Sequence, residues 1–137
     1  MKEFFKLLIG TICLMGFSHK AFAQLDTLNY LKQFETNKAN YIGQPLSKLL
    51  NDMIQIQPKT VWTNPPKNNR NIILNTRFKF CEMDYSFYNT ITLGITWETS
   101  IPRSQVIYYE QLNGFYFTND EKLFYGNKIV KDILVYR

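Results

Sequence analysis

Apolar residues recur with two different periods along this chain, and the change of period divides it into two parts. Between residues 25 and 57 they recur every three or four positions, as on one face of an α-helix. From residue 72 onward they alternate with polar residues, as in strands with one buried face. Helices that precede a run of sequential strands predict an α+β domain. We expect two N-terminal helices packed on one face of an antiparallel sheet of about five strands.

The first helix is predicted over residues 25–40, and the second begins at Pro45 and ends before Pro58. Asp26 or Thr27 can act as the N-cap of the first helix, because a short oxygen-bearing side chain there accepts a hydrogen bond from an N–H of the first turn. Proline is tolerated in the first turn of a helix, which fits the start of the second. This second helix carries the stronger amphipathic stripe, made of Leu46, Leu49, Leu50, Met53 and Ile54.

Residues 63–71 have loop chemistry throughout, with two prolines and four asparagines. Strands are predicted over residues 72–80, 90–97, 105–112, 115–117 and 129–136. Asn113-Gly114 is typical of a tight hairpin between the third and the fourth of them. The residues predicted to face the core are Ile72, Leu74, Phe78, Phe80, Ile91, Leu93, Ile95, Trp97, Ile129, Ile133 and Val135. The opposite face is predicted to show Arg77, Lys79, Thr90, Thr92 and Thr96.

Residues 1–23 have the pattern of a secretory signal peptide. Lys2 and Lys6 form a basic start, an apolar run of 11 residues follows, and Ala21-Phe22-Ala23 is a small-residue cleavage site. The run is about half the length that a membrane-spanning helix needs. We therefore expect cleavage after Ala23 and a single domain, residues 24–137, that is periplasmic or secreted by a bacterium and has no stable membrane insertion.

Removal of the signal peptide would limit the available chemistry. His19 is the only histidine, and Cys13 is one of the two cysteines, so residues 24–137 contain no histidine and one thiol, Cys81. Nucleophile systems that need a histidine base are then excluded, and a zinc site would be unusual. Cys81 is either a buried thiol or a bridge to another chain. The sequence predicts no catalytic residue, no metal and no cofactor, and hence a protein that is not an enzyme.

The charge of the chain argues against a nucleic-acid partner. Residues 24–137 carry 13 Lys and Arg against 10 Asp and Glu, a net charge of +3. A balance this modest does not indicate binding to nucleic acid, and export would separate the protein from cellular nucleic acid. We expect the partner to be another protein.

Aromatic residues are the most distinctive part of the composition, because residues 24–137 hold nine tyrosines, seven phenylalanines and two tryptophans. Three of these aromatics fall in the turn 84–89, although turns are normally polar. The turn is either a small core folded over the end of the sheet or a tip that binds a partner. Alternation would place Tyr108 and Tyr109 on opposite faces of a strand. The candidate partner-binding residues are Tyr85, Phe87, Tyr88, Tyr109, Tyr116, Arg70, Arg77 and Lys79.

These observations favour an exported, non-enzymatic protein-binding module, and more specifically an immunity protein or inhibitor directed against a toxin or hydrolase that acts on the cell envelope. Two alternatives remain open. One is a carboxylate-dependent enzyme acting on an envelope polymer, with Glu82, Asp84, Glu98 and Glu110 as its candidate residues. The other is a small-ligand carrier with an apolar pocket between helices and sheet, lined by Leu46, Leu50, Phe78 and Trp97.

Overall fold

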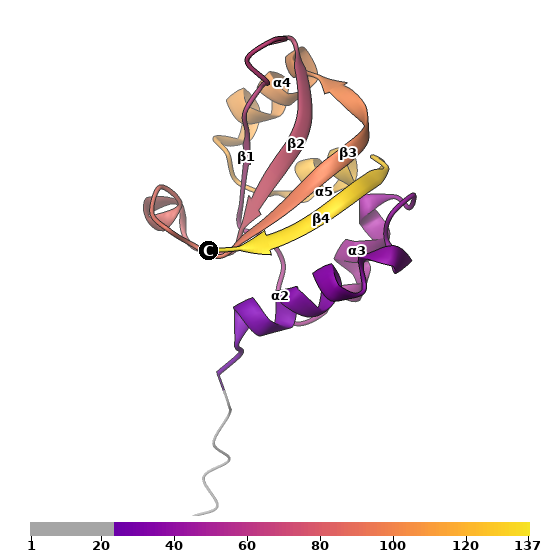
Figure 1. The fold of residues 1–137 in the computed structure, drawn as a ribbon. Helices are drawn as coiled ribbons and strands as arrows, with labels where there is room; N and C mark the ends of the chain where they lie inside the picture. Colours follow the sequence, from indigo (N-terminus) through magenta and orange to yellow (C-terminus); the bar gives the residue numbers. More distant parts are fainter. Residues whose placement is uncertain (1–23) are drawn as a thin grey trace, which may run out of the picture.

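Four antiparallel strands form one sheet in which the spatial order follows the chain order, β1-β2-β3-β4 (Figure 1). The computed structural model describes residues 24–137, and the predicted signal peptide, residues 1–23, lies outside them. The strands are β1 (Thr60–Thr63), β2 (Ile72–Lys79), β3 (Thr92–Pro102) and β4 (Val130–Tyr136). The α+β class and the antiparallel sheet predicted from the sequence are confirmed, with four strands in the described residues where about five were expected.

Two helices precede the strands, and two more lie between β3 and β4. The helices are α2 (Thr27–Thr36), α3 (Leu46–Asp52), α4 (Arg103–Asn113) and α5 (Asn119–Gly126), with short 3₁₀ turns η1 (Lys38–Asn40) and η2 (Met83–Tyr85). None of the helices in residues 24–137 is long and apolar enough to cross a bilayer.

The placement of the helices differs from the prediction. Figure 1 shows α4 and α5 behind the sheet, whereas α2 runs beside the edge strand β4. The second N-terminal helix, α3, packs mainly on α5. The two N-terminal helices therefore do not jointly cover a sheet face as predicted, because an aromatic side chain of α5 already fills that face.

The N-terminal helices begin and end close to the predicted positions. Asp26 is the N-cap of α2, and its Oδ1 accepts a hydrogen bond of 3.2 Å from the backbone N–H of Asn29. Pro45 precedes α3 as its N-cap residue instead of lying in its first turn. Met53 is buried as predicted, but Ile54 is 84% exposed because the helix ends at Asp52. The inclusion of Ile54 in the apolar stripe was therefore wrong.

The predicted strand over residues 105–112 is the helix α4, and the predicted hairpin after it does not form. Tyr108 and Tyr109 follow one another in this helix, with their rings 5.1 Å apart and both lining one groove, so their assignment to opposite faces of a strand was wrong. Gly114 ends the helix with φ 59° and ψ 45°, a left-handed conformation that glycine adopts without steric cost. An Asn-Gly pair fits a helix C-terminus as well as a hairpin, and here the helical use prevails.

Helix α5 was not predicted, although its start carries a recognisable signal. Thr118 and Glu121 form a capping box, in which the Thr118 backbone N–H donates to Glu121 Oε2 at 2.9 Å. Glu121 is only 1% exposed, and its Oε1 accepts a hydrogen bond of 2.7 Å from Asn113 Nδ2 at the end of α4. One buried carboxylate thus joins the end of α4 to the start of α5 and fixes the turn between them.

The centre of the core is the ring of Tyr125, which α5 inserts against the sheet. It lies parallel to the ring of Trp97 on β3 at 5.8 Å and edge-on to Phe78 on β2 at 5.5 Å. Trp97 Nε1 donates to Thr76 Oγ1 at 2.9 Å, so the indole N–H is satisfied inside the core. Tyr125 is 2% exposed and therefore contributes nearly its whole surface to the contact between helix and sheet.

Two irregularities of strand register change which residues face the core. The β2–β3 register shifts between Ile73 and Asn75, so Ile73 is buried whereas Leu74 is 40% exposed. A second shift, opposite Thr96 and Trp97, buries Val130 on β4 and leaves Ile129 37% exposed. In the first shift β3 has three extra residues, and in the second β4 has one. An odd number of extra residues reverses the alternation of one strand relative to its partner. The predicted core positions Ile72, Leu74 and Ile129 were wrong for this reason, while Phe78, Phe80, Leu93, Ile95, Trp97, Ile133 and Val135 are buried as predicted.

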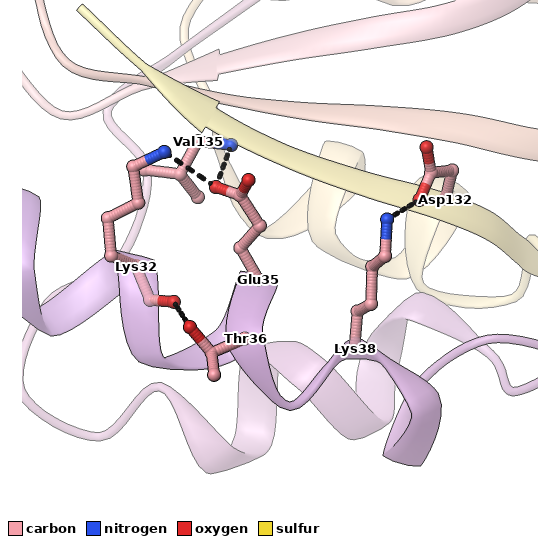
Figure 2. Close-up of polar contacts among 6 residues, drawn as sticks. All are labelled: Lys32, Glu35, Thr36, Lys38, Asp132 and Val135. Atoms are coloured by element: carbon pink, nitrogen blue, oxygen red, sulfur yellow. Dashed lines mark hydrogen bonds and ion pairs between the residues drawn. The ribbon is translucent and has the colours of Figure 1, made fainter.

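Both outer strands of the sheet have their free edges covered. Along β4, the backbone N–H of Gly43 donates to the Val130 carbonyl at 2.8 Å. Farther along, Glu35 Oε2 on α2 accepts from the backbone N–H of Val135 at 2.9 Å (Figure 2). A second link from the end of α2 is the ion pair between Lys38 Nζ and Asp132 Oδ1, at 2.7 Å.

The segment 115–117 covers the edge of β1 on the opposite side of the sheet. Val61 N–H donates to the Phe115 carbonyl, and Phe117 N–H donates to the Lys59 carbonyl, both at 2.9 Å. The strand predicted here forms only an isolated bridge between Thr60 and Tyr116. Because unpaired strand edges promote association between sheets, these covers limit edge-to-edge pairing.

Substitution of Tyr125 tests its place in the core. We expect Tyr125→Ala to lower the free energy of unfolding by about 3–5 kcal/mol, the range for a large aromatic removed from a core. Tyr108→Ala, at a side chain that is 59% exposed, should change it by less than about 1 kcal/mol. Urea unfolding followed by tryptophan fluorescence measures both values, and equal losses would contradict the central position of Tyr125.

The contact between Glu35 and β4 predicts a pH-dependent stability. The hydrogen bond from Lys32 holds the Glu35 pKa below its ordinary value, with help from the Val135 N–H and against the opposing effect of burial. A lowered pKa adds stability above the unfolded-state value, about 4.3, and this stability is lost as the pH falls through the folded-state pKa. We expect Glu35→Gln to cost about 1–2 kcal/mol at pH 7.

That cost should shrink as the pH falls from about 5 to 3, because the wild-type carboxylate then becomes protonated. Urea unfolding at several pH values measures the difference between the two proteins. Glu98→Gln, at an exposed carboxylate of β3, is the matched control and should show little difference at any pH. A cost for Glu35→Gln that stays constant down to pH 3 would contradict the assignment.

Candidate protein-binding surface

The connection between β2 and β3, residues 80–91, folds back over the face of the sheet opposite α4 and α5. We call this the outer face. The connection contains η2, and its backbone is held by a hydrogen bond from Lys79 Nζ to the Ser86 carbonyl. Ser86 is 2% exposed, and its hydroxyl donates to the Met83 carbonyl at 2.6 Å. A small polar residue therefore anchors this connection, which we call the aromatic loop.

The three aromatic side chains in the turn 84–89 of this loop point away from its anchor. Tyr85 is 61% exposed, Phe87 76% and Tyr88 70%. Among the three, and within residues 24–137, only the Phe87 ring has an aromatic neighbour, Trp62 on β1, at 5.3 Å in an edge-on arrangement. The turn therefore does not form the small core considered from the sequence, because Ser86 is its buried residue and the aromatics remain at the surface.

Trp62 supports the loop and was not singled out from the sequence. Its ring stacks on Phe115 at 4.5 Å, with the ring of Phe87 on its edge, and its Nε1 donates to Thr60 Oγ1 at 3.1 Å. The strand that carries it, β1, is only four residues long and was missed because it directly precedes the proline-rich loop. The run Thr-Val-Trp-Thr is rich in strand-forming residues and was the available signal.

Next to the loop, the sheet carries a row of cross-strand neighbours on its outer face. The strand registers pair Trp62 with Arg77, Arg77 with Gly94, and Gly94 with Leu134. A shallow groove of about 180 Å³ lies over the glycine. Its lining residues are Asn75, Arg77, Gly94, Thr96, Leu134 and Tyr136.

Two cations lie on this face without an acidic partner in residues 24–137. The ion pairs within that part of the chain join Lys32 with Glu35, Lys38 with Asp132, and Lys59 with Glu82. Arg77 and Lys79 belong to none of them. Burial lowers the pKa of Lys79, and the neighbouring positive charge of Arg77 lowers it further. Thr92, predicted to be exposed here, is buried at 2%.

The remaining candidate residues lie away from the loop and the groove. Tyr109 on α4 is half-buried, with its ring 4.6 Å from that of Phe124, and it lines a separate groove of about 360 Å³. Tyr116 is 48% exposed and lies in the segment that covers β1, while Arg70 is exposed in the loop before β2. The predicted set therefore separates, with Tyr85, Phe87, Tyr88, Arg77 and Lys79 gathered on or beside the aromatic loop.

The four candidate catalytic carboxylates lie on different structural elements. Glu82 precedes η2 and pairs with Lys59 at 2.6 Å, while Asp84 lies within η2, because β2 ends at Lys79 and does not continue to them. Glu98 is exposed on β3. Glu110 belongs to α4 and not to a strand, and its Oε1 accepts from Thr63 Oγ1 at 3.2 Å.

Burial raises the pKa of Glu110, against the opposing effects of the Thr63 hydrogen bond and the charge of Arg103. Its described contacts connect α4 to the end of β1 and give it a structural role there. In residues 24–137, no group of three or more His, Cys, Asp or Glu side chains is arranged to hold a metal ion. Cys81 is a free, half-buried thiol within that range.

The region in which a carrier would need its pocket is occupied by the protein itself. Phe78 and Trp97 contact the ring of Tyr125, and Phe117 approaches Phe78 edge-on at 5.5 Å. Leu46 and Leu50 are at most 1% exposed. The core between the helices and the sheet is therefore built of packed aromatic and aliphatic side chains at these positions.

Comparison with known proteins finds no matching family model, no matching curated protein and no matching solved structure.

The exposure of the loop aromatics predicts that they contribute little to folding. We expect Tyr85→Ala and Tyr88→Ala each to change the free energy of unfolding by less than about 0.5 kcal/mol, as is usual for surface substitutions. Trp62→Ala should cost at least about 1–2 kcal/mol, because it removes a stacked ring and the support of Phe87. Thermal unfolding followed by circular dichroism gives both quantities, and a large loss in either tyrosine variant would show that the loop aromatics are structural.

Proposed function

We propose that residues 24–137 form an exported, non-enzymatic protein-binding module that acts as an immunity protein or inhibitor of an envelope-acting toxin or hydrolase. The observation that carries this proposal is the aromatic loop, in which three large aromatic side chains stay exposed on a backbone pinned to the sheet. Export rests on the signal-peptide pattern of residues 1–23.

Physical chemistry supports this use of the loop. Clustered exposed aromatics are uncommon on monomeric proteins and typically mark sites of association. Tyrosine and phenylalanine bury a large area at low cost in side-chain entropy, and aromatic residues are enriched among those that dominate binding energies. Because the Lys79–Ser86 contact already orders the loop, binding of a partner would cost less conformational entropy of the loop.

The chemistry of the described residues also favours binding over catalysis. Residues 24–137 contain no histidine, and the carboxylates considered for catalysis lie on different elements and have separate roles as ion-pair partner, surface charge and helix-to-strand contact. An inhibitor needs a stable surface and no reacting group, which fits a loop supported by Trp62 and Phe115.

Site-specific photocrosslinking in the source cells tests this proposal. A photoreactive phenylalanine analogue at position 88 should give one discrete crosslinked species in the envelope fraction, identifiable by mass spectrometry as a toxin or hydrolase. The same analogue at position 54, an exposed apolar position at the end of α3, is the matched control and should not give that species. Identical bands from both positions, or no band from position 88, would contradict the proposal.

The captured protein then provides the functional test. Purified residues 24–137 should inhibit its activity, and the pair Tyr85→Ala and Tyr88→Ala should weaken binding at least about tenfold, as is typical of central aromatic contacts. If these variants fold normally, their weaker binding reflects loss of the aromatic contacts and not loss of structure. Capture of a protein whose activity the module leaves unchanged would support binding but overturn the inhibitor assignment.

A further inference from the structure

The groove over Gly94 lies outside the aromatic loop, and the function proposed for the loop assigns no role to it. We propose that it receives a carboxylate side chain, Asp or Glu, from the partner protein that docks on the aromatic loop. This inference rests on the function proposed above and specifies the chemistry of the partner. The strand register, the open space over the glycine and the charge around it support this assignment.

The outer face of the sheet is divided between a covered part and an open part. The cross-strand set Thr60, Lys79, Thr92 and Tyr136 is covered at Thr60 and Thr92, with exposed fractions of 0% and 2%. Its β4 member, Tyr136, is 39% exposed and lines the groove. The adjacent row, with Arg77 and Gly94, carries the groove. The space over Gly94 thus begins where the covered part of this face ends.

Gly94 is the floor of this groove. Glycine in the middle of a strand weakens it, and it often marks a place where another group approaches the backbone closely. A Cβ added to Gly94 would lie 3.5 Å from both the Leu134 carbonyl oxygen and Tyr136 Cε1, an ordinary contact distance. Substitution by alanine would therefore fit without displacing its neighbours, yet it would fill part of the space.

The polar groups around the glycine suit a carboxylate. Arg77 has five N–H donors, and one of them donates to the Asn64 side-chain oxygen at 2.9 Å in the amide orientation that satisfies both groups. Its remaining donors have no acidic partner within residues 24–137. Asn75 and Thr96 add further polar side chains to the lining. A guanidinium binds a carboxylate through two parallel hydrogen bonds, which gives both strength and orientation.

Size and openness favour a side chain of a partner over a free small molecule. The groove is shallow and holds about 180 Å³, whereas sites for free ligands usually enclose larger volumes and bury most of the ligand surface. A carboxylate delivered by a protein already docked on the neighbouring loop gains from a high effective concentration. Phe87 lies against Trp62, which belongs to the same cross-strand row as Arg77 and Gly94, so one partner can reach the loop and the groove together.

Titration with short peptides tests the groove without the partner. The probes are acetyl-Ala-Glu-Ala-amide and its glutamine counterpart, added to ¹⁵N-labelled residues 24–137 and followed by NMR. We expect saturable shifts of the amides of Arg77, Gly94 and Leu134 with the glutamate peptide in the millimolar range. The glutamine peptide should bind at least about tenfold more weakly, because it lacks the charge that Arg77 pairs with.

Variants make the test specific to the groove. Arg77→Gln should weaken binding of the glutamate peptide at least about tenfold, and Gly94→Ala should do the same by filling the space. Arg70→Gln, which removes an exposed cation from the loop before β2, is the matched control and should leave binding unchanged. Gly94→Ala keeps the test valid if the arginine variant does not fold, because its added Cβ meets only ordinary contacts.

Several outcomes would overturn the inference. These are equal responses to the two peptides, equal losses in Arg77→Gln and Arg70→Gln, tighter binding of inorganic phosphate than of the glutamate peptide, and no saturable response. A crosslink from position 88 without any peptide response would overturn the groove assignment alone. A groove-specific peptide response without a crosslink would support the groove and contradict the proposed function.

Discussion

The ring of Tyr125 is the contact on which the rest of the structure depends. It lies between Phe78 of β2 and Trp97 of β3, and the next residue, Gly126, brings α5 close to Ser47 of α3. The sheet, α5 and α3 are therefore joined through two consecutive residues. Burial raises the Tyr125 pKa, and the charges of Glu110 and Glu121 raise it further, which favours the neutral phenol in the core. A neutral ring with a polar end can fill a core that also contains the Trp97 to Thr76 hydrogen bond.

The sequence predicted those parts of the fold in which local pattern and tertiary packing agree. Leu46, Leu49 and Leu50 of α3 and the alternating Leu93, Ile95 and Trp97 of β3 are buried as expected. The alternation failed on β2 and β4, because bulges reverse the facing of side chains and are set by pairing with another strand. It failed on α4 because tyrosines and isoleucine favour strands locally, while packing of Val106 and the Gly114 terminus produce a helix. The capping box at the start of α5 is a signal that the sequence itself carries.

The candidate surface was predictable in its aromatics but not in its arrangement. Three aromatic residues in a short turn are unusual in any sequence, so Tyr85, Phe87 and Tyr88 stood out without a structure. The contribution of Trp62 depends on the pairing of β1 with β2 and on a stack with Phe115, which lies 53 residues farther along the chain. The groove likewise requires the registers of two strand pairs, β2–β3 and β3–β4, neither of which a local pattern specifies. The residue types of the surface were therefore predictable, whereas its arrangement, which depends on long-range strand pairing, was not.

The covered edges of the sheet limit which parts of the module can evolve new binding contacts. Glu35 and residues 43–46 occupy the free edge of β4, and residues 115–117 occupy that of β1, so a partner finds few main-chain groups to pair with along these strands. Under the proposed function, a partner is then recognised through side chains of the loop and the outer face. Such positions can be replaced one at a time without disturbing strand pairing. The architecture thus allows the choice of partner to diversify by point substitution while the framework stays constant.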